Sequence, residues 1–374
     1  MSVERWALKT QEGNPALIEF IPNEIRERGP QSFAWFMQQA LYHPEHGYCS
    51  SGRCAIGRKG DYFTNVSVGP LFGRLLGAQF VEIWDRLGKT DNFVIVEQGA
   101  HDGQFARDVL ESVEKRAPEF FAALRYRIVE PFPILQERQS RTLELFRDKI
   151  EWCDSLQPFV GVHFSNELLD AMPVRLVSNG SEKFVGVDGD RFVFVERPVD
   201  DDVQFNETVL DWIDDVAAKL QRGYVIAIDY GRSRTKFQGH VQVRAQHRNL
   251  DSPFEQIGHA DITMGVDWTS IADRAQSNGL RVAGFTDQHH FLTGIVSESL
   301  DFTSESGAKI KRELQTLLHP EMLGRAFHVL ALEKDVDPSA HRLAGFKFAR
   351  EPGAVLQVRR DPTSGSCARY ARRY

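Results

Sequence analysis

The chain has 374 residues, of which 42% are hydrophobic and 26% are charged, and it carries a formal net charge of −7. This composition is typical of a globular protein with one large domain or two ordinary ones, and it excludes disordered and fibrous classes. Because the chain is acidic and has no long Lys/Arg run, we expect no nucleic-acid partner. No stretch of about 18 apolar residues occurs, so we expect no membrane partner either.

The first residues and the cysteines favour a cytoplasmic location. Charged side chains at Glu4, Lys9 and Glu12 stand where a secretory signal peptide is apolar. The four cysteines are too few and too scattered for a disulfide framework in a chain of this length. We therefore expect reduced thiols in the cytoplasm.

Two helical patterns come first in the chain. Apolar residues recur at helical spacing in residues 30–48, up to breaks at Pro44 and Gly47, and again in residues 70–87. We expect both segments to belong to an N-terminal helical cap that spans residues 1–90.

From Asn92 onward, short apolar runs alternate with longer amphipathic runs. This alternation is typical of βα units and predicts an α/β fold with a Rossmann-like core over residues 91–350. The expected strands cover residues 93–97, 126–130, 151–153, 160–165, 224–230, 281–285 and 327–333. The expected helices cover residues 104–116, 134–147, 211–220, 268–277 and 304–318.

Two segments interrupt this pattern, and a tail follows it. Around the turn signals Asn179-Gly180 and Asp188-Gly189 apolar and polar residues alternate, which predicts a β meander inserted at about residues 174–204. Residues 233–265 lack clear periodicity, and an excursion of that length in a compact domain tends to be functional. The polar tail, residues 351–374, is predicted to be mobile.

The strongest chemical signal is the loop between the first core strand and its helix. Glycines there let the backbone approach a ligand, and the helix N-terminus offers free amide donors. The spacing of Gly99 and Gly103 lacks the G-x-G-x-x-G pattern of dinucleotide enzymes, and the acid Glu97 suits a ligand with an ammonium group and no phosphate. S-adenosyl-L-methionine is such a ligand. The candidate cofactor-binding residues of this loop are Glu97, Gly99, Ala100, His101 and Gly103.

A second acid supports the same ligand. Glu130 closes the next strand, where an acid can accept hydrogen bonds from the two ribose hydroxyls of a nucleoside. Taken singly, each of these residues also fits an ordinary βα turn or a solvated strand end. Together they point to one carboxyl edge of one sheet, where open α/β folds bind ligands.

Several longer motifs follow one another in a fixed order. They are ALYHPEHGY at 40–48, IGRKGDYFT at 56–64, LFG at 71–73, V-E-x-G at 96–99, VEP at 129–131, NELLDAMP at 166–173, IDYG at 228–231 and G-x-x-D-I-T-x-x-V-D at 258–267. From about residue 32 to residue 333 the chain resembles the MidA family, methyltransferases related to a mitochondrial complex I assembly factor. The resemblance implies a Rossmann-like methyltransferase that binds S-adenosyl-L-methionine, with Thr64 as a further cofactor contact.

The resemblance also suggests an acceptor. The mitochondrial member is understood to methylate an arginine of a complex I subunit, which implies a protein substrate here. Two segments depart from the family pattern. His101 replaces the middle glycine of the family's Glu-Leu-Gly-Pro-Gly-Arg-Gly loop, and Asn65-Val66-Ser67 stands where the family has Ser-Pro-Glu.

Candidate catalytic residues follow the fourth core strand. Methyl transfer from a sulfonium is an in-line displacement, and good alignment of donor and acceptor is worth about 7–11 kcal/mol. Asn166 and Glu167 are expected to face the methyl group, with Glu167 holding a guanidinium or an amine and Asp170 accepting a proton. Asp229 and Tyr230 close another strand and are expected beside the same cleft. Helix-capping or surface acids are the alternative interpretation.

Other functions stay open at this point. A small-molecule N- or O-methyltransferase is favoured by the altered Asn65-Val66-Ser67 segment, and a binding or assembly protein without turnover is favoured by His101. A homodimer is compatible with the sequence. The spacing His43-x-x-His46-x-x-Cys49-x4-Cys54 matches no standard zinc pattern, so we predict no metal.

Overall fold

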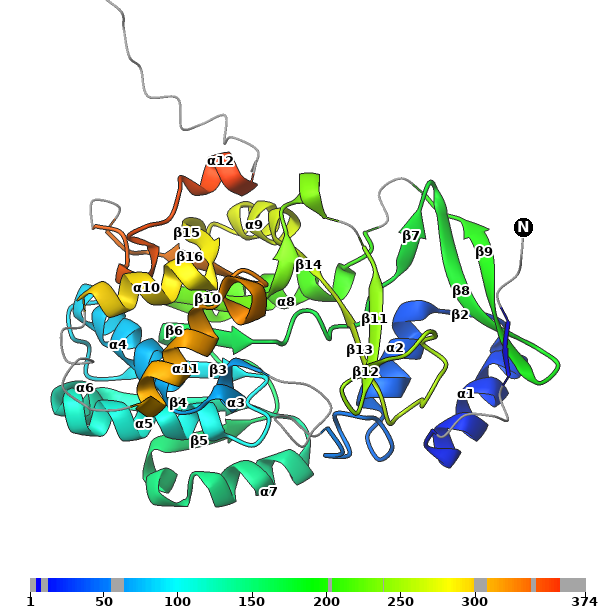
Figure 1. Cartoon of the computed structure of the whole chain (residues 1–374), viewed down its shortest axis with the longest axis horizontal. Coiled ribbons are helices and arrows are strands. Elements are labelled where there is room, and N and C mark those ends of the chain that lie inside the picture. Colours follow the sequence, from blue (N-terminus) through cyan, green and yellow to red (C-terminus); the bar gives the residue numbers. More distant parts are fainter. Residues whose placement is uncertain are drawn as a thin grey trace, which may run out of the picture.

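The computed structural model describes residues 5–7, 13–54, 64–200, 204–237, 239–298, 308–337 and 341–356. Within them a large α/β core lies beside a smaller part formed by the first helices and several antiparallel strands (Figure 1). The predicted motif at 56–64 lies outside the described residues except for Thr64, and so do the start of the helix expected at 304–318 and most of the tail.

The core is an eight-stranded sheet with the order β15-β16-β10-β6-β3-β4-β5, and the short β14 pairs with the end of β10. From β5 to β10 all neighbouring strands run parallel, whereas β16 runs antiparallel to both β10 and β15. The strands are β3 (Phe93–Gln98), β4 (Leu124–Val129), β5 (Ile150–Cys153), β6 (Phe159–Asn166), β10 (Leu220–Arg232), β14 (Val266–Asp267), β15 (Arg281–Asp287) and β16 (Phe327–Lys334). The predicted α/β Rossmann-like core is confirmed.

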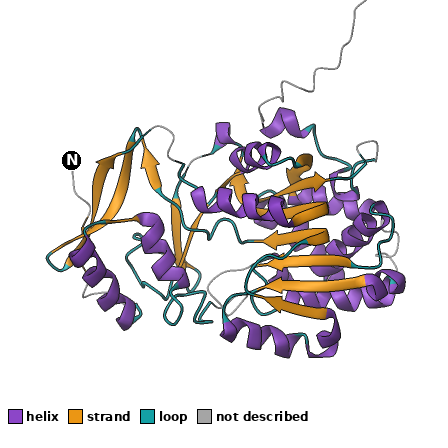
Figure 2. Cartoon of the chain, turned by 180° about the vertical axis from the view of Figure 1, so that it is seen from behind, coloured by secondary structure: helices purple, strands orange, loops and turns teal. Residues whose placement is uncertain are grey.

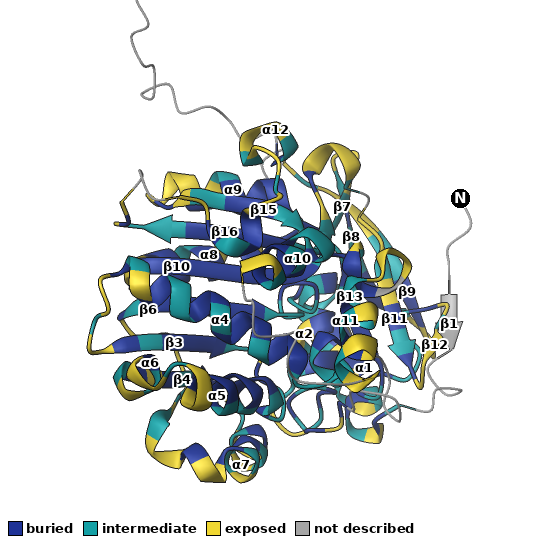
Figure 3. Cartoon of the chain, turned by 60° about the vertical axis from the view of Figure 1, so that its left-hand side comes forward, coloured by how far each residue is buried: buried dark blue, intermediate teal, exposed yellow. Residues whose placement is uncertain are grey.

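Helices cover both faces of this sheet (Figure 2). One face carries α4 (Leu71–Arg86), α5 (Gln104–Arg116), α6 (Pro118–Ala123), α10 (Gln288–Glu298) and α11 (Ala308–Leu318). The opposite face carries α8 (Glu207–Lys219), α9 (Trp268–Ser277) and α12 (Pro352–Leu356). The central strands are buried by these two layers (Figure 3), which explains why their sequences are continuous apolar runs.

Two expected elements differ in the structure. We expected α4 in an N-terminal cap, but it packs on α5 and the core sheet because Leu75, Leu76 and Phe80 on its inner face are fully buried. The helix expected at 134–147 is α7 (Pro133–Thr142) followed by the 3-10 helix η1 (Glu144–Lys149), which leads directly into β5. The domain boundaries drawn from the sequence stay predictions.

The smaller part contains the predicted meander. Strands β7 (Leu176–Ser178), β8 (Ser181–Asp188) and β9 (Arg191–Pro198) pair antiparallel, and the positive φ angles of Asn179, Gly180 and Gly189 allow the tight turns between them. The edges of this sheet carry β1 (Arg5–Ala7) and β2 (Gln31–Ser32). Helices α1 (Pro15–Arg28) and α2 (Phe33–Tyr42) share a hydrophobic cluster with it, so the inserted meander and the first helices form one packing unit.

The excursion at 233–265 holds a third sheet, with the order β12-β11-β13. It consists of β11 (Val241–Ala245), β12 (Arg248–Asn249) and β13 (Asp261–Met264), preceded by the 3-10 helix η2 (Arg234–Lys236). The remaining short elements are α3 (Asn65–Val68), η4 (Pro320–Gly324) and η5 (Ala344–Phe346). A search of the described residues for a helix of sufficient length and apolarity to cross a membrane finds none.

Candidate active site

A cavity of about 790 Å³ lies at the carboxyl edge of the core sheet. The loops after β3, β4, β5 and β6 line it from one side, and α2, β11 and β13 line it from the other. The helix that follows β3, α5, packs on one face of the sheet, and the next helix after β6, α8, packs on the other. With β3 and β6 adjacent in the strand order, this is the crevice where open α/β folds bind ligands. The predicted site residues that line it are Thr64, Glu97, Gly99, Ala100, His101, Glu130, Asn166, Glu167 and Asp170.

Among the predicted cofactor-binding residues, Gly103 alone does not line the cavity. It forms the N-cap of α5 with φ of 82°, and a Cβ added there would contact Leu143. Its role in the structure is therefore to allow the turn into the helix.

The loop after β3 brings a buried acid to the cavity. Glu97 accepts a hydrogen bond from the Tyr126 hydroxyl at 2.7 Å, and burial raises its pKa to about 8. Gly99 has φ of 82°, and a Cβ there would lie 3.3 Å from Leu168. The backbone thus approaches the loop after β6 closely, and a ligand ammonium beside Glu97 would restore its charged form.

Glu130 is buried directly after β4. Its carboxylate accepts hydrogen bonds from the Phe132 amide at 3.0 Å and from the Gln139 side chain at 3.1 Å, while burial raises its pKa. Gln139 also donates to the His101 carbonyl. The two predicted cofactor loops are therefore held together by one glutamine.

His101 adopts the left-handed backbone conformation, with φ of 49°. Its Nε2 lies 3.1 Å from the Cys54 carbonyl, so this nitrogen donates, and Nδ1 lies 3.6 Å from Asp102. Burial acts to lower the pKa of His101, but the contacts with Asp102 and Cys54 raise it overall. The imidazole thus ties the cofactor loop to the segment after α2.

We expect His101→Gly to bind S-adenosylhomocysteine with an affinity within about threefold of the parent. Glycine adopts positive φ without strain, and the imidazole is already engaged with Cys54 and Asp102. Isothermal titration calorimetry measures this, with Gly99→Ala as the matched control, since its added Cβ meets Leu168 and weakens binding. A rise in affinity of more than about tenfold for His101→Gly would mean that the imidazole crowds the ligand.

The loop after β6 presents the predicted catalytic residues. Glu167 has φ of 54°, an uncommon conformation that clusters at functional sites. Its Oε1 accepts hydrogen bonds from the Asn166 side chain at 2.9 Å and from the Asn65 amide at 3.3 Å. The Asn65 side chain donates to Asn166 as well, so the segment that departs from the family pattern positions both residues.

Asp229 lies behind this loop. Its Oδ2 accepts backbone hydrogen bonds from Leu168, Leu169 and Asp170 at 2.8–3.2 Å. Burial and the nearby charge of Glu167 raise its pKa to about 7. Of the pair expected beside the cleft, Tyr230 lines the cavity, and Asp229 instead fixes the backbone of the loop after β6.

Acids dominate one end of the cavity. Loss of solvent and the charge of Asp170 raise the pKa of half-buried Glu167 to about 8. Burial likewise raises the pKa of Asp170 and of Asp261 well above the usual range, with repulsion between neighbouring carboxylates adding to it. Three carboxyl groups that share one poorly solvated region favour the binding of a cationic ligand.

Several lining residues were not predicted as site residues. Asp154 and Ser155 follow β5 as Glu130 follows β4, so the same strand-end rule applies to them. Tyr42, Arg244 and Asp261 come from α2 and the third sheet, and no local pattern places them at the cavity.

The histidines and cysteines weighed as zinc ligands have other roles. His43 stacks on His46 with ring centroids 5.0 Å apart, while Cys49 and Cys54 line the cavity. Across the described ranges no group of three or more His, Cys, Asp or Glu side chains is arranged to hold a metal ion.

The buried acids predict a pH dependence of stability. Because the pKa values of Glu97 and Glu167 are raised to about 8, the folded state favours their neutral forms. The contribution of these two neutral carboxyl groups to the free energy of unfolding is fully present below the ordinary carboxyl pKa. It is lost as pH rises through about 8, where the groups must ionise in the folded state. We expect the Tm of the ligand-free protein to be lower at pH 8.5 than at pH 6 by at least about 2 °C, and the decline to be shallower in Glu167→Gln. A constant or rising Tm in differential scanning calorimetry would contradict this.

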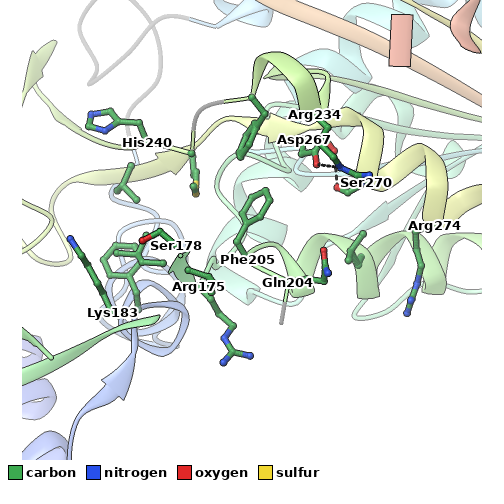
Figure 4. Close-up of a pocket in the computed structure, with 18 of the residues that line it drawn as sticks. Arg175, Ser178, Lys183, Gln204, Phe205, Arg234, His240, Asp267, Ser270 and Arg274 are labelled. Atoms are coloured by element: carbon green, nitrogen blue, oxygen red, sulfur yellow. Dashed lines mark hydrogen bonds and ion pairs between the residues drawn. The ribbon is translucent and has the colours of Figure 1, made fainter. Parts of the chain in front are cut away.

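A larger groove of about 1890 Å³ lies on the opposite face of β11 and β13 (Figure 4). Side chains alternate along these strands, so Val243 and Met264 line the groove while Arg244 and Thr263 line the cavity. The groove contains none of the predicted site residues.

Comparison with known proteins gives relatives that extend over most of the chain. "Protein arginine methyltransferase NDUFAF7, mitochondrial" from Mus musculus is 26% identical and matches over 84% of this chain and 84% of its own length. The Homo sapiens protein of the same name is 25% identical over 84% of this chain and 83% of its own length.

Solved structures agree with this. A structure from Burkholderia thailandensis with bound S-adenosyl-homocysteine has a TM-score of 0.80 and 26% sequence identity, covering 91% of this chain and 97% of that chain. A native crystal structure from the same organism has a TM-score of 0.77 at 25% identity, over 91% of this chain and 96% of that chain.

The family profile gives the assignment. It describes S-adenosyl-L-methionine-dependent methyltransferases and matches residues 75–286, more than half of the chain and the part that contains the predicted cofactor loops. The cavity has the volume of a ligand pocket, usually about 300–1,000 Å³, and its two buried acids suit an ammonium group and a ribose. The chain belongs to the S-adenosyl-L-methionine-dependent methyltransferase family, and S-adenosyl-L-methionine is its cofactor.

Proposed function

We propose that this methyltransferase transfers a methyl group to an arginine side chain of a protein substrate. The observation that carries the proposal is the acidic end of the cavity, where Glu167, Asp170 and Asp261 lie together without an ion pair to any described residue within 4.0 Å. A guanidinium that enters there offers five donors and a charge that is never lost. The names of the mouse and human relatives support the same acceptor.

The cofactor supplies an electrophilic methyl group, and the chain's own residues hold the two reactants. In this proposal Glu97 would pair with the ammonium of the cofactor, and Glu130 would accept hydrogen bonds from its ribose. Glu167 binds the incoming guanidinium, and this cation draws the glutamate into its charged form. Asn65, Asn166 and Asp229 orient Glu167 and its loop.

A proton must leave the arginine nitrogen as the new N–C bond forms. In this proposal Asp170, which lies beside Glu167 at the acidic end, receives the proton. Its raised pKa keeps it neutral in the empty site, and the charge of the bound guanidinium draws it into the carboxylate form that can accept. The cytoplasmic location stays a prediction, whereas the relatives are named as mitochondrial proteins.

The test uses isotope-labelled S-adenosyl-L-methionine with arginine peptides, matched lysine peptides and a mixture of small-molecule amines and alcohols. With the parent enzyme we expect the label to appear on arginine. With Glu167→Gln we expect the same peptides to stay unlabelled. Label on lysine or only on small molecules would contradict the proposed acceptor while leaving the family assignment intact.

A further inference from the structure

Arg244 lines the cavity at its acidic end, from strand β11. It stands directly opposite Asp261 in the pairing of β11 with β13, so both side chains project from the same face of that sheet. It acts electrostatically on Asp170, Asp261 and Tyr230. The charges that act on the pKa values of Glu97 and Glu130 are instead those of Asp102 and His101, respectively. Arg244 therefore belongs to the acceptor end of the cavity.

The hydrogen bonds of Arg244 are incomplete. One terminal nitrogen donates to Gln242 at 2.6 Å, which fixes the direction of the guanidinium. Its Nε is buried and has no hydrogen-bond partner among the residues that the structure describes. A buried donor on a permanently charged group favours an acceptor from outside the chain.

The other arginines that line the cavity or the groove differ from Arg244 in their ion pairs. In the groove of Figure 4, Arg175 pairs with Glu182, Arg234 with Asp267, Arg274 with Asp214, and Arg281 with Glu333. Arg244 forms no ion pair within 4.0 Å in the described part of the chain, although its charge acts to lower the pKa values of Asp170 and Asp261. Four of these arginines are thus ion-paired within the chain, whereas Arg244 at the acceptor end can form an ion pair with a ligand.

We propose that Arg244 binds a carboxylate of the protein substrate that flanks the arginine to be methylated. This inference rests on the proposed function, since it assumes a peptide acceptor. A carboxylate can bind the Nε and one terminal nitrogen of a guanidinium together, which fixes direction as well as charge. A substrate that carries both an arginine and a nearby acid therefore matches the acids and the single arginine at this end of the cavity.

The experiment uses short arginine peptides in which one aspartate is placed in turn at each position near the arginine, each with its asparagine counterpart. For the parent enzyme we expect at least one aspartate peptide to have a KM about tenfold below that of its asparagine partner. Arg244→Gln is expected to bring that ratio to about one, and Arg244→Glu to favour lysine at the same position. Arg281→Gln, which removes an ion-paired arginine outside the cavity, is expected to keep the ratio of the parent.

Binding of S-adenosylhomocysteine is measured on the same variants by calorimetry. An unchanged affinity in Arg244→Gln supports the proposal and shows that the cofactor site is folded. A loss of affinity would assign Arg244 to the cofactor carboxylate and overturn it, as would an aspartate preference that persists in Arg244→Gln. Methylation of arginine peptides without any aspartate preference overturns this inference alone. If no arginine peptide is methylated, the proposed function fails and this inference fails with it.

Discussion

Glu167→Gln is expected to lower kcat for methyl transfer by roughly 100- to 10,000-fold while the Kd of S-adenosylhomocysteine stays within about threefold. The glutamine keeps the volume and can still accept from Asn166 and the Asn65 amide, so the loop retains its shape. What is lost is the negative charge that holds the acceptor cation in line. Single-turnover kinetics with labelled cofactor measure this effect directly.

The control for this variant is Glu151→Gln, which removes a half-exposed carboxylate paired with Arg127 at the edge of the sheet. Its kcat is expected to match that of the parent. If Glu167→Gln retained more than about one tenth of the parent kcat, its carboxylate would not be the group that aligns the acceptor.

Glu130→Gln is expected to weaken the binding of S-adenosylhomocysteine by roughly 10- to 100-fold, because hydrogen bonds from ribose hydroxyls to a charged acceptor are worth about 1.5–3 kcal/mol. At saturating cofactor, kcat is expected to change little, since Glu130 lies at the cofactor end of the cavity and away from the acids around Glu167. Calorimetry gives the Kd and steady-state kinetics give kcat.

Glu137→Gln is the matched control for this second variant. That glutamate lies exposed on α7 and pairs with Arg141, outside the cavity. Equal affinities of Glu130→Gln and the parent would remove Glu130 from the ribose site.

Residues at strand ends could be identified from the sequence because the geometry of a parallel sheet fixes where they lie. Glu97, Glu130 and Glu167 each follow an apolar run, and all three line one cavity in the structure. Asp154 follows β5 in the same way, and although a strand was expected at 151–153, Asp154 was not among the predicted site residues. The rule that polar residues at the ends of parallel strands line the ligand crevice therefore applies to short strands such as β5 as well.

Contacts between distant segments could not be predicted in this way. Arg244 and Asp261 come together through the pairing of β11 with β13, and Tyr42 reaches the cavity through the packing of α2. No periodicity in the excursion reveals strands of two to five residues that pair across the loop between them. These residues line the end of the cavity that we propose for the acceptor, so less of that end than of the proposed cofactor end could be predicted from the sequence.

Helix α1 was missed for a local reason. Pro22 lies inside it, and a proline in a helix interior removes a backbone hydrogen bond and usually signals a break. The helix forms nevertheless, because Asn14 caps its start and Leu17, Ile21 and Ile25 are buried against the meander and α2. Tertiary packing here outweighs the local penalty.

A crystal structure of this protein with S-adenosylhomocysteine tests the central claim most directly. We expect the ribose hydroxyls on Glu130, the ammonium near Glu97 and the sulfur turned toward Glu167. A ligand found in the groove of Figure 4, or a sulfur directed away from Glu167, would contradict the account.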